Sequence, residues 1–395
     1  MRTVGTPVRL MVVAGTRPEA IKLAPVVMAA RSRPEQFACQ LVATGQHRHM
    51  LRQALSVFSL APDIDLDIMQ ERQTLAQVAC RSIEGLDNVL REHTPDIVFV
   101  QGDTLAVAAG AMAAYFHQVP VGHVEAGLRT GNIYDPFPEE MNRRLAGKLC
   151  TLHFAPTEQA RSNLLAEGTV PDTIYLTGNT ATDAVRWAAE HAACADEGDP
   201  LCTIDGGPVA LPTGLRWIVV TAHRRENIPD RLERICVALR RLCARGDVAV
   251  IFAVHPNPAV REIVRPVLGD VDTAVLIEPP DYAQFAHLLA QSAIVITDSG
   301  GIQEEAPSLG KPVLVVRETT ERPEGVAAGV AKLVGTDTET IVMEATRLLD
   351  DESAYASMVH RASPYGDGRC SDRILDATLH HFGLGPRPAD IASEG

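Results

Sequence analysis

Short runs of β-branched and aliphatic residues alternate along the chain with longer stretches that have helical spacing. Parallel sheets that are covered by helices on both faces give this pattern, because their strands are buried on both sides. The sequence therefore predicts a doubly wound α/β protein. In the first half, a helix is expected over 74–93, and the expected strands are 9–14, 38–44, 97–101, 121–125 and 152–155.

A polar stretch with glycine and proline at 195–214 interrupts the alternation, which then resumes. Such a stretch is typical of a linker, so it marks a domain boundary to within several residues. The strands expected after it are 217–221, 249–254, 274–277, 294–297 and 312–316. A final helical pattern at 371–382 has no strand after it.

These patterns predict two Rossmann-like domains facing a central cleft. The expected bounds are 1–185 for an N-terminal domain and 186–364 for a C-terminal domain. In the remaining segment, 365–395, the helix should pack back on the N-terminal domain. The tail from Gly383 should be disordered.

Length and charge narrow the range of functions. A chain of 395 residues is too long to fold around one ordinary hydrophobic core. Because 46% of its residues are hydrophobic, it has enough of them to form two cores. A formal charge of −14 argues against nucleic acid or an anionic membrane as the main partner. No apolar run reaches the ~18 residues of a membrane span, so a cytoplasmic location is expected. Eight scattered cysteines without a CxxC pair predict reduced thiols, and no metal site is expected.

The turn after the first expected strand reads GTRPEAIK over 15–22. Pro18 suits a helix start, and backbone amides at a helix start favour an anion. Arg17 and Lys22 add positive charge beside it. The turn therefore resembles a phosphate site, although a plain strand-to-helix turn with two surface cations would look the same.

Acidic residues follow two later strands directly. Asp103 and Glu125 both stand at carboxyl ends of expected strands, where ligands of open α/β sheets bind. Two acids at one sheet edge suggest acid/base chemistry. Asp103 could instead cap the helix that begins near Leu105. Glu139 follows soon after Glu125 and is either a third acid of the same site or a charge at a helix start.

In the second half, His223, Arg224 and Arg225 follow a strand and suit a diphosphate, because guanidinium groups bind phosphate oxygens in pairs. A lone histidine is more often structural. A stronger pattern starts at Ser299. The next two residues, Gly300 and Gly301, have no Cβ atom, which would let a phosphate approach a helix start.

Further along that helix Glu305 could accept hydrogen bonds from ribose hydroxyls, and Phe285 could lie near a base. An aromatic residue at this position is more often part of the core. The residues of this nucleotide site are therefore Ser299, Gly300, Gly301 and Glu305, and Phe285 is either a fifth member or part of the core.

Several motifs together resemble the non-hydrolysing UDP-N-acetylglucosamine 2-epimerases of bacteria. Their joint order and spacing over nearly the whole chain carry the resemblance. The motifs are GTRPEAIK, TGQHR, QGDT, HVEAGLRTG, PEEMNRR, AHRREN, HPNP, TDSGGIQEEAPSLGKPV and TERPEG.

The resemblance implies a glycosyltransferase-B-like fold, usually dimeric, that interconverts UDP-N-acetylglucosamine and UDP-N-acetylmannosamine without an added cofactor. It implies catalytic roles for Arg17, Lys22, Asp103, Glu125, Glu139 and His223. It also implies that Ser299, Gly301, Glu305 and Arg322 hold the nucleotide, with Phe285 near uracil. A second, activating UDP-N-acetylglucosamine would lie near Gln46, Arg72 and His255.

The expected chemistry follows from the weak acidity of the sugar C2 hydrogen. Loss of UDP, with a carboxylate taking the C2 proton, would give 2-acetamidoglucal, and readdition with protonation on the other face would invert C2. The family usually continues GDT with further threonines, where this chain has Leu105 and Ala106. A modified UDP-acetamido sugar therefore stays open as the substrate. Three other functions also stay open, namely a UDP-sugar-dependent glycosyltransferase, a hydrolysing epimerase and a non-catalytic sensor.

Overall fold

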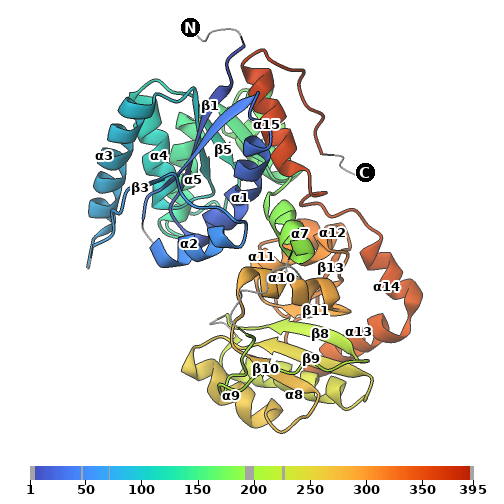
Figure 1. Ribbon diagram of the computed structural model, residues 1–395. Coiled ribbons are helices and arrows are strands. Elements are labelled where there is room, and N and C mark those ends of the chain that lie inside the picture. Colours follow the sequence, from blue (N-terminus) through green and yellow to red (C-terminus); the bar gives the residue numbers. More distant parts are fainter. Residues whose placement is uncertain (1–4, 46–47, 71, 192–199, 225–226, 392–395) are drawn as a thin grey trace. The chain divides into compact units, whose positions relative to one another are not determined.

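The computed structural model describes residues 5–45, 48–70, 72–191, 200–224 and 227–391. The chain forms two compact units. Unit 1 consists of Met1–Ala184 and Tyr365–Gly395, and unit 2 consists of Val185–Pro364. Each unit is built around a parallel sheet with helices on both faces (Figure 1).

The sheet of unit 1 has the strand order β3-β2-β1-β4-β5-β6-β7. The five strands expected from the sequence are all present, within one residue at each end. β3 and β7, which have two and three residues, were not predicted. The bounds are β1 Val8–Ala14, β2 Phe37–Ala43, β3 Ile64–Asp65, β4 Ile97–Gln101, β5 Val121–Val124, β6 Leu152–Ala155 and β7 Ile174–Leu176.

Helices cover both faces of this sheet. On one face α1 contacts α2 and α15, and Figure 1 shows α15, in red, beside α1, in blue. On the other face α4 packs between α3 and α5. The bounds are α1 Arg17–Arg31, α2 Arg48–Ser56, α3 Leu75–His93, α4 Leu105–Phe116, α5 Glu139–Leu149, α6 Glu158–Ala166, α7 Ala181–His191 and α15 Cys370–His381, with a 3-10 turn at Pro171–Thr173.

The C-terminal segment packs on unit 1 and completes it. The Asp183 carboxylate accepts hydrogen bonds from the backbone amides of Cys370, at 3.1 Å, and Ser371, at 2.7 Å, and so fixes the start of α15. The expectation of disorder from Gly383 was wrong for residues 383–391. The amide of Ile391 donates to the Leu176 carbonyl at 2.9 Å, so the tail partners the edge strand β7.

Unit 2 has the strand order β10-β9-β8-β11-β12-β13. The five expected strands are again present, and the three-residue β13 was not predicted. The strands are β8 Arg216–Thr221, β9 Val248–Ala253, β10 Ala274–Ile277, β11 Ile294–Thr297, β12 Val313–Val315 and β13 Ala331–Leu333. The helices are α8 Asp230–Cys243, α9 Pro258–Leu268, α10 Tyr282–Gln291, α11 Gly300–Ser308, α12 Pro323–Ala327, α13 Thr338–Asp350 and α14 Glu352–Val359.

The polar stretch 195–214 does not separate the units, contrary to the expectation. Residues 195–199 lie outside the described residues, and 200–214 belong to unit 2. Ile204 is buried in the core of unit 2, and its amide donates to the Leu276 carbonyl at 3.1 Å. The division between the units falls within α7, after Ala184, which is one residue before the end of the 1–185 range expected for the N-terminal domain.

Gly127 lies in the turn after β5, and its conformation gives a first prediction. Its φ is +92°, and a Cβ there would lie 2.3 Å from the Ala160 carbonyl oxygen. Gly168 has a φ of +82° with open space around it. We expect Gly168→Ala to cost about 1–2 kcal/mol from conformation alone. Gly127→Ala should cost clearly more, since the clash adds to this. Thermal unfolding followed by circular dichroism measures both, and equal losses of stability would contradict the prediction.

Candidate active site

Two acidic residues meet at the carboxyl edge of the unit 1 sheet. β4 pairs with β5 so that Gln101 lies opposite Val124, and the Gly102 amide donates to the Val124 carbonyl at 3.0 Å. Asp103 and Glu125 follow these two strand ends. The structure therefore brings together the two acids that the sequence placed at one edge.

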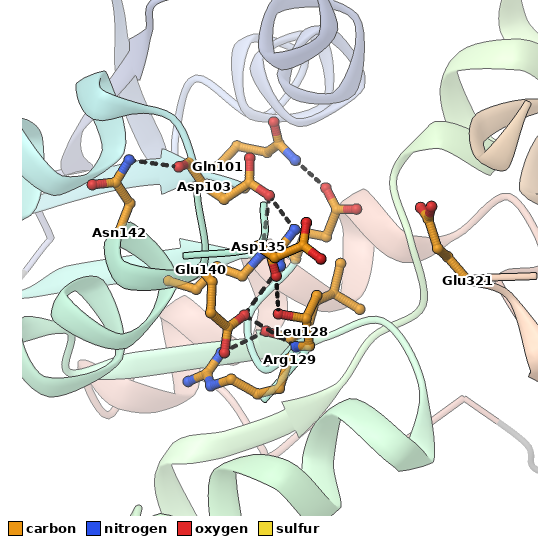
Figure 2. A network of polar contacts seen from close by, with 12 residues as sticks. Gln101, Asp103, Leu128, Arg129, Asp135, Glu140, Asn142 and Glu321 are labelled. Carbon is orange, nitrogen blue, oxygen red and sulfur yellow. Dashed lines mark hydrogen bonds and ion pairs between the residues drawn. The ribbon is translucent and has the colours of Figure 1, made fainter. Parts of the chain in front are cut away.

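Asp103 does not cap the helix after it, so the capping alternative was wrong. Thr104 is the N-cap of α4, and its hydroxyl accepts from the Ala106 amide at 3.2 Å. The Asp103 carboxylate instead accepts from Arg143, whose Nε and Nη2 lie 2.9 and 2.5 Å from Oδ2. The side-chain amide of Asn142 donates to the Asp103 carbonyl at 2.9 Å (Figure 2).

Glu125 is a buried carboxylate surrounded by donors. Lys22 Nζ lies 2.7 Å from each of its oxygens, and the side chain of Glu125 is 5% exposed. The side-chain amides of Gln101 and Asn179 also donate to it, the latter at 3.3 Å. Its φ of +63° is unusual for a residue other than glycine. An ammonium group and two amides stabilise the ionised carboxylate at this position.

The expected phosphate site at GTRPEAIK is different in the structure. The amides of Gly15 and Thr16 donate to the carboxylate of Glu19, the latter at 3.0 Å. Thr104 donates to the other oxygen of Glu19. These two amides therefore already bind a carboxyl group, which belongs to the protein itself. The same turn carries Arg17, which is half-buried and makes no hydrogen bond or ion pair with the described part of the chain.

The buried Glu19 predicts a pH dependence of stability. Burial raises its pKa from 4.5 to about 7, although hydrogen bonds from Thr104, Gly15 and Thr16 lower it. The folded protein then holds a proton that the unfolded chain releases near pH 4.5, so stability falls as pH rises from about 4.5 to 7. The loss amounts to about 3 kcal/mol.

The control variant is Glu19→Gln, whose amide can accept from Gly15 and Thr16 and donate to Thr104 without titrating. We expect the melting temperature of the natural protein to fall across this pH window more than that of the variant. Parallel curves for the two proteins would contradict the prediction.

Glu139 and Glu140 both begin α5, but their surroundings differ. Glu139 is half-buried, and its side chain makes no hydrogen bond or ion pair among the residues that the structure describes. The side chain of Glu140 is fully buried. Its carboxylate accepts from the Thr130 amide at 3.1 Å and from Arg143 and Arg144. The carboxylate of Glu139 is thus the one of the two that is unengaged.

In unit 2, a buried aspartate holds the turn that carries His223. Asp298 Oδ2 accepts from the backbone amides of His223 and Arg224, both at 2.8 Å, and from the Asn227 side chain at 3.0 Å. Its Oδ1 lies 3.5 Å from His223 Nδ1. The His223 ring stacks on that of His255, with centroids 5.2 Å apart. Arg225 of the same motif lies outside the described residues.

The start of α11 has the open geometry that a phosphate needs. Ser299 is its N-cap, and a Cβ at Gly301 would meet no atom within 4 Å. At Gly300 a Cβ would lie 3.9 Å from Glu321 Oε2 and 4.0 Å from the guanidinium carbon of Arg322, which pairs with Glu304. Amides at a helix start, with an arginine beside them, fit an anion such as a diphosphate.

α10 and α11 are joined beside this turn. The hydroxyl of Tyr282, the first residue of α10, donates to Glu305 Oε1 at 3.2 Å. Phe285 lies one turn further along α10 and is partly buried. The expected ribose and base contacts, Glu305 and Phe285, therefore both lie on helices that meet beside the glycine turn.

The expected second ligand site is not assembled within either unit. Gln46 lies outside the described residues. Arg72 is exposed in unit 1, with a φ of +58°, just before α3. His255 follows β9 in unit 2 and stacks on His223.

Four residues with clear roles in this geometry were missed from the sequence. Asp298 follows a strand end directly, as Asp103 does, so the strand-end rule could have found it. The other three hold Asp103 or Glu125 from positions distant in the chain and have no such signal. They are Gln101, Arg143 and Asn179.

The helices of the described residues contain no segment that is long and apolar enough to cross a membrane. The family model described as UDP-N-acetylglucosamine 2-epimerase matches residues 29–379. The UDP-N-acetylglucosamine 2-epimerase of Bacillus subtilis strain 168 is 48% identical over 380 residues, which cover 95% of this chain and 96% of that protein.

Solved structures agree with these matches. A crystal structure of a UDP-N-acetylglucosamine 2-epimerase is 45% identical, with a TM-score of 0.87 and coverage of 98% of this chain and 100% of that chain. The enzyme from Neisseria meningitidis, solved bound to UDP-GlcNAc, is 40% identical, with a TM-score of 0.79 and coverage of 94% and 100%. The predicted α/β class and glycosyltransferase-B-like fold are therefore confirmed.

Proposed function

The chain belongs to the UDP-N-acetylglucosamine 2-epimerase family, and we propose that it interconverts UDP-N-acetylglucosamine and UDP-N-acetylmannosamine. An isomerase of this kind must move a proton at C2. The observation that carries the proposal is the placement of Asp103 and Glu125 at neighbouring strand ends of unit 1, with Lys22 bound to Glu125. In such a reaction a carboxylate can accept the C2 proton, and a nearby cation can stabilise the negative charge of the departing UDP.

The proposed reaction conserves all atoms and electrons. The bond between C1 and the β-phosphate oxygen breaks, and its electron pair leaves with UDP. A carboxylate removes the C2 proton, and a double bond forms between C1 and C2 to give 2-acetamidoglucal. UDP then adds back to C1 while C2 is protonated on the opposite face. No oxidant or reductant is required.

We assign the proton transfers to Asp103, Glu125 and Glu139. Asp103 supports this assignment because the described contacts of its carboxylate all end on Oδ2, so Oδ1 can meet a proton. Arg17, Lys22 and His223 would stabilise the departing UDP. In unit 2, the glycine turn at Ser299, Gly300 and Gly301 would hold the diphosphate, with Arg322 beside it and Glu305 and Phe285 at the nucleoside.

The position after QGDT gives reason to test more than one sugar. Leu105 and Ala106 replace the threonines that are usual there, and Ala106 is buried, with its Cβ 2.5 Å from where a Cβ on Gly15 would lie. Leu105 is partly exposed. A modified UDP-acetamido sugar is therefore the second candidate substrate. We also propose a homodimer, which light scattering would detect at about twice the 42.5 kDa of one chain.

The test is incubation of the purified protein with UDP-N-acetylglucosamine alone, followed by proton NMR, and then with a panel of UDP-acetamido sugars. We expect UDP-N-acetylmannosamine to accumulate to an equilibrium. A glycosyltransferase would leave the substrate unchanged without an acceptor. A hydrolysing enzyme would release free UDP and N-acetylmannosamine, and a sensor would bind the substrate without converting it. Any of these three results would refute the proposal.

A further inference from the structure

Asp103 is held from a single direction, by helix α5. Arg143 contributes both its Nε, at 2.9 Å, and its Nη2, at 2.5 Å, to the same oxygen, Oδ2. The residue before it, Asn142, donates to the Asp103 backbone carbonyl at 2.9 Å (Figure 2). Consecutive residues of one helix thus fix both the main chain and the carboxylate of Asp103.

The third nitrogen of the Arg143 guanidinium group is also bound. Its Nη1 donates to Glu140 Oε2 at 3.2 Å, and the Thr130 amide donates to that oxygen at 3.1 Å. Burial alone would raise the pKa of Glu140, but hydrogen bonds from Thr130, Arg144 and Arg143 outweigh it and hold the pKa below its usual value. The planar guanidinium group therefore lies between two carboxylates and cannot turn without losing one of them.

This arrangement leaves one oxygen of Asp103 unengaged. Within the described residues, every hydrogen bond to the Asp103 carboxylate ends on Oδ2. Because one oxygen of the carboxylate is bound, the other oxygen is held in a fixed orientation. The same helix begins with Glu139, so α5 sets the positions of two of the proposed acids at once.

We propose that Arg143, anchored by the buried Glu140, is a positioning residue that orients Asp103 for proton transfer. This inference rests on the proposed epimerisation. Arg143 does not need to touch the substrate, because it acts through Asp103. A purely structural role, in which Arg143 only ties α5 to the turn after β4, is the alternative that an experiment must separate.

The first measurement compares Arg143→Met with Arg144→Met. Arg144 lies beside it and donates to the other oxygen of Glu140 at 3.1 Å, whereas the carboxylate of Asp103 is bound by Arg143. We expect Arg143→Met to lower kcat about 10²-fold, because a misplaced reacting group can cost that much, with little change in KM. Arg144→Met should keep nearly the natural kcat.

The second measurement is a double-mutant cycle with Asp103→Asn, read as deuterium incorporation at C2. If Arg143 acts through Asp103, Arg143→Met causes little further loss in the Asp103→Asn background. If it is purely structural, it lowers the rate by the same factor in both backgrounds. Circular dichroism checks folding. Should Arg143→Met fail to fold, Arg143→Lys, which keeps the charge but not the planar fork, takes its place in the cycle.

The outcomes separate this inference from the proposed function. A natural protein that does not convert UDP-N-acetylglucosamine refutes the function, and the inference falls with it. A natural protein that epimerises, with equal losses in the two backgrounds or a normal kcat for the Arg143 variants, refutes the inference alone. A large loss in the natural background, a small one with Asp103→Asn, and a normal Arg144→Met support it.

Discussion

Replacing Asp103 with asparagine should lower kcat for epimerisation by about 10²–10⁴-fold, the usual contribution of a general acid or base. The amide oxygen of the variant can still accept from Arg143, so the local structure should persist while the proton acceptor is lost. KM should change little, since the proposed phosphate contacts are elsewhere. Initial rates with UDP-N-acetylglucosamine, followed by NMR, measure the effect.

The matched control is Asp96→Asn at the opposite end of the same strand. Asp96 precedes β4 and pairs with Arg9 at 2.8 Å on the surface. Its variant should turn over normally. Normal turnover by Asp103→Asn would remove Asp103 from the reaction.

Replacing Glu125 with glutamine should have an effect of similar size on activity and a larger one on stability. Lys22, Gln101 and Asn179 all donate to the carboxylate at this position. The NH₂ group of a glutamine would therefore face another donor instead of an acceptor. Breaking a buried ion pair costs about 3–5 kcal/mol, and here somewhat less, because the Lys22 side chain is 20% exposed. We expect a fall in kcat of about 10²–10⁴-fold together with a lower melting temperature.

Glu158→Gln is the control for this variant. Glu158 follows β6 at the same edge of the sheet and pairs with Arg161 at 3.1 Å, but its side chain is 53% exposed. Exposed ion pairs contribute little, so both activity and melting temperature should stay near the natural values. A Glu125→Gln protein as active and as stable as this control would contradict both the catalytic role of Glu125 and the stabilising role of its ion pair with Lys22.

The sequence was sufficient to predict the long strands, because each is an apolar run buried on both faces. It was insufficient for β3, β7 and β13, which have two or three residues; β12 is as short but was predicted, because Val316 lengthens its apolar run. Residues 200–214 were assigned to a linker from their polarity. Their place in unit 2 depends on one apolar residue, Ile204, and on backbone pairing with β10, which composition does not report.

In the candidate site, the residues that could be predicted are those placed directly after a strand end. Asp103 and Glu125 were found in this way because parallel strands align their carboxyl ends. The partners of these acids could not be predicted, since Arg143 reaches Asp103 only through the packing of α4 against α5. The occupation of the Gly15 and Thr16 amides by Glu19 was missed because a helix start favours any anion, including a side chain of the helix itself.

The central claim is that UDP leaves C1 and returns while the C2 proton is exchanged. The most direct test uses UDP-N-acetylglucosamine with ¹⁸O in the bridge between C1 and the β-phosphorus, incubated with the protein in deuterated water. We expect ¹⁸O to move into non-bridging positions of the β-phosphate and deuterium to enter C2 of the recovered sugar nucleotides. Epimerisation with the label retained in the bridge, or with no deuterium at C2, would contradict the claim.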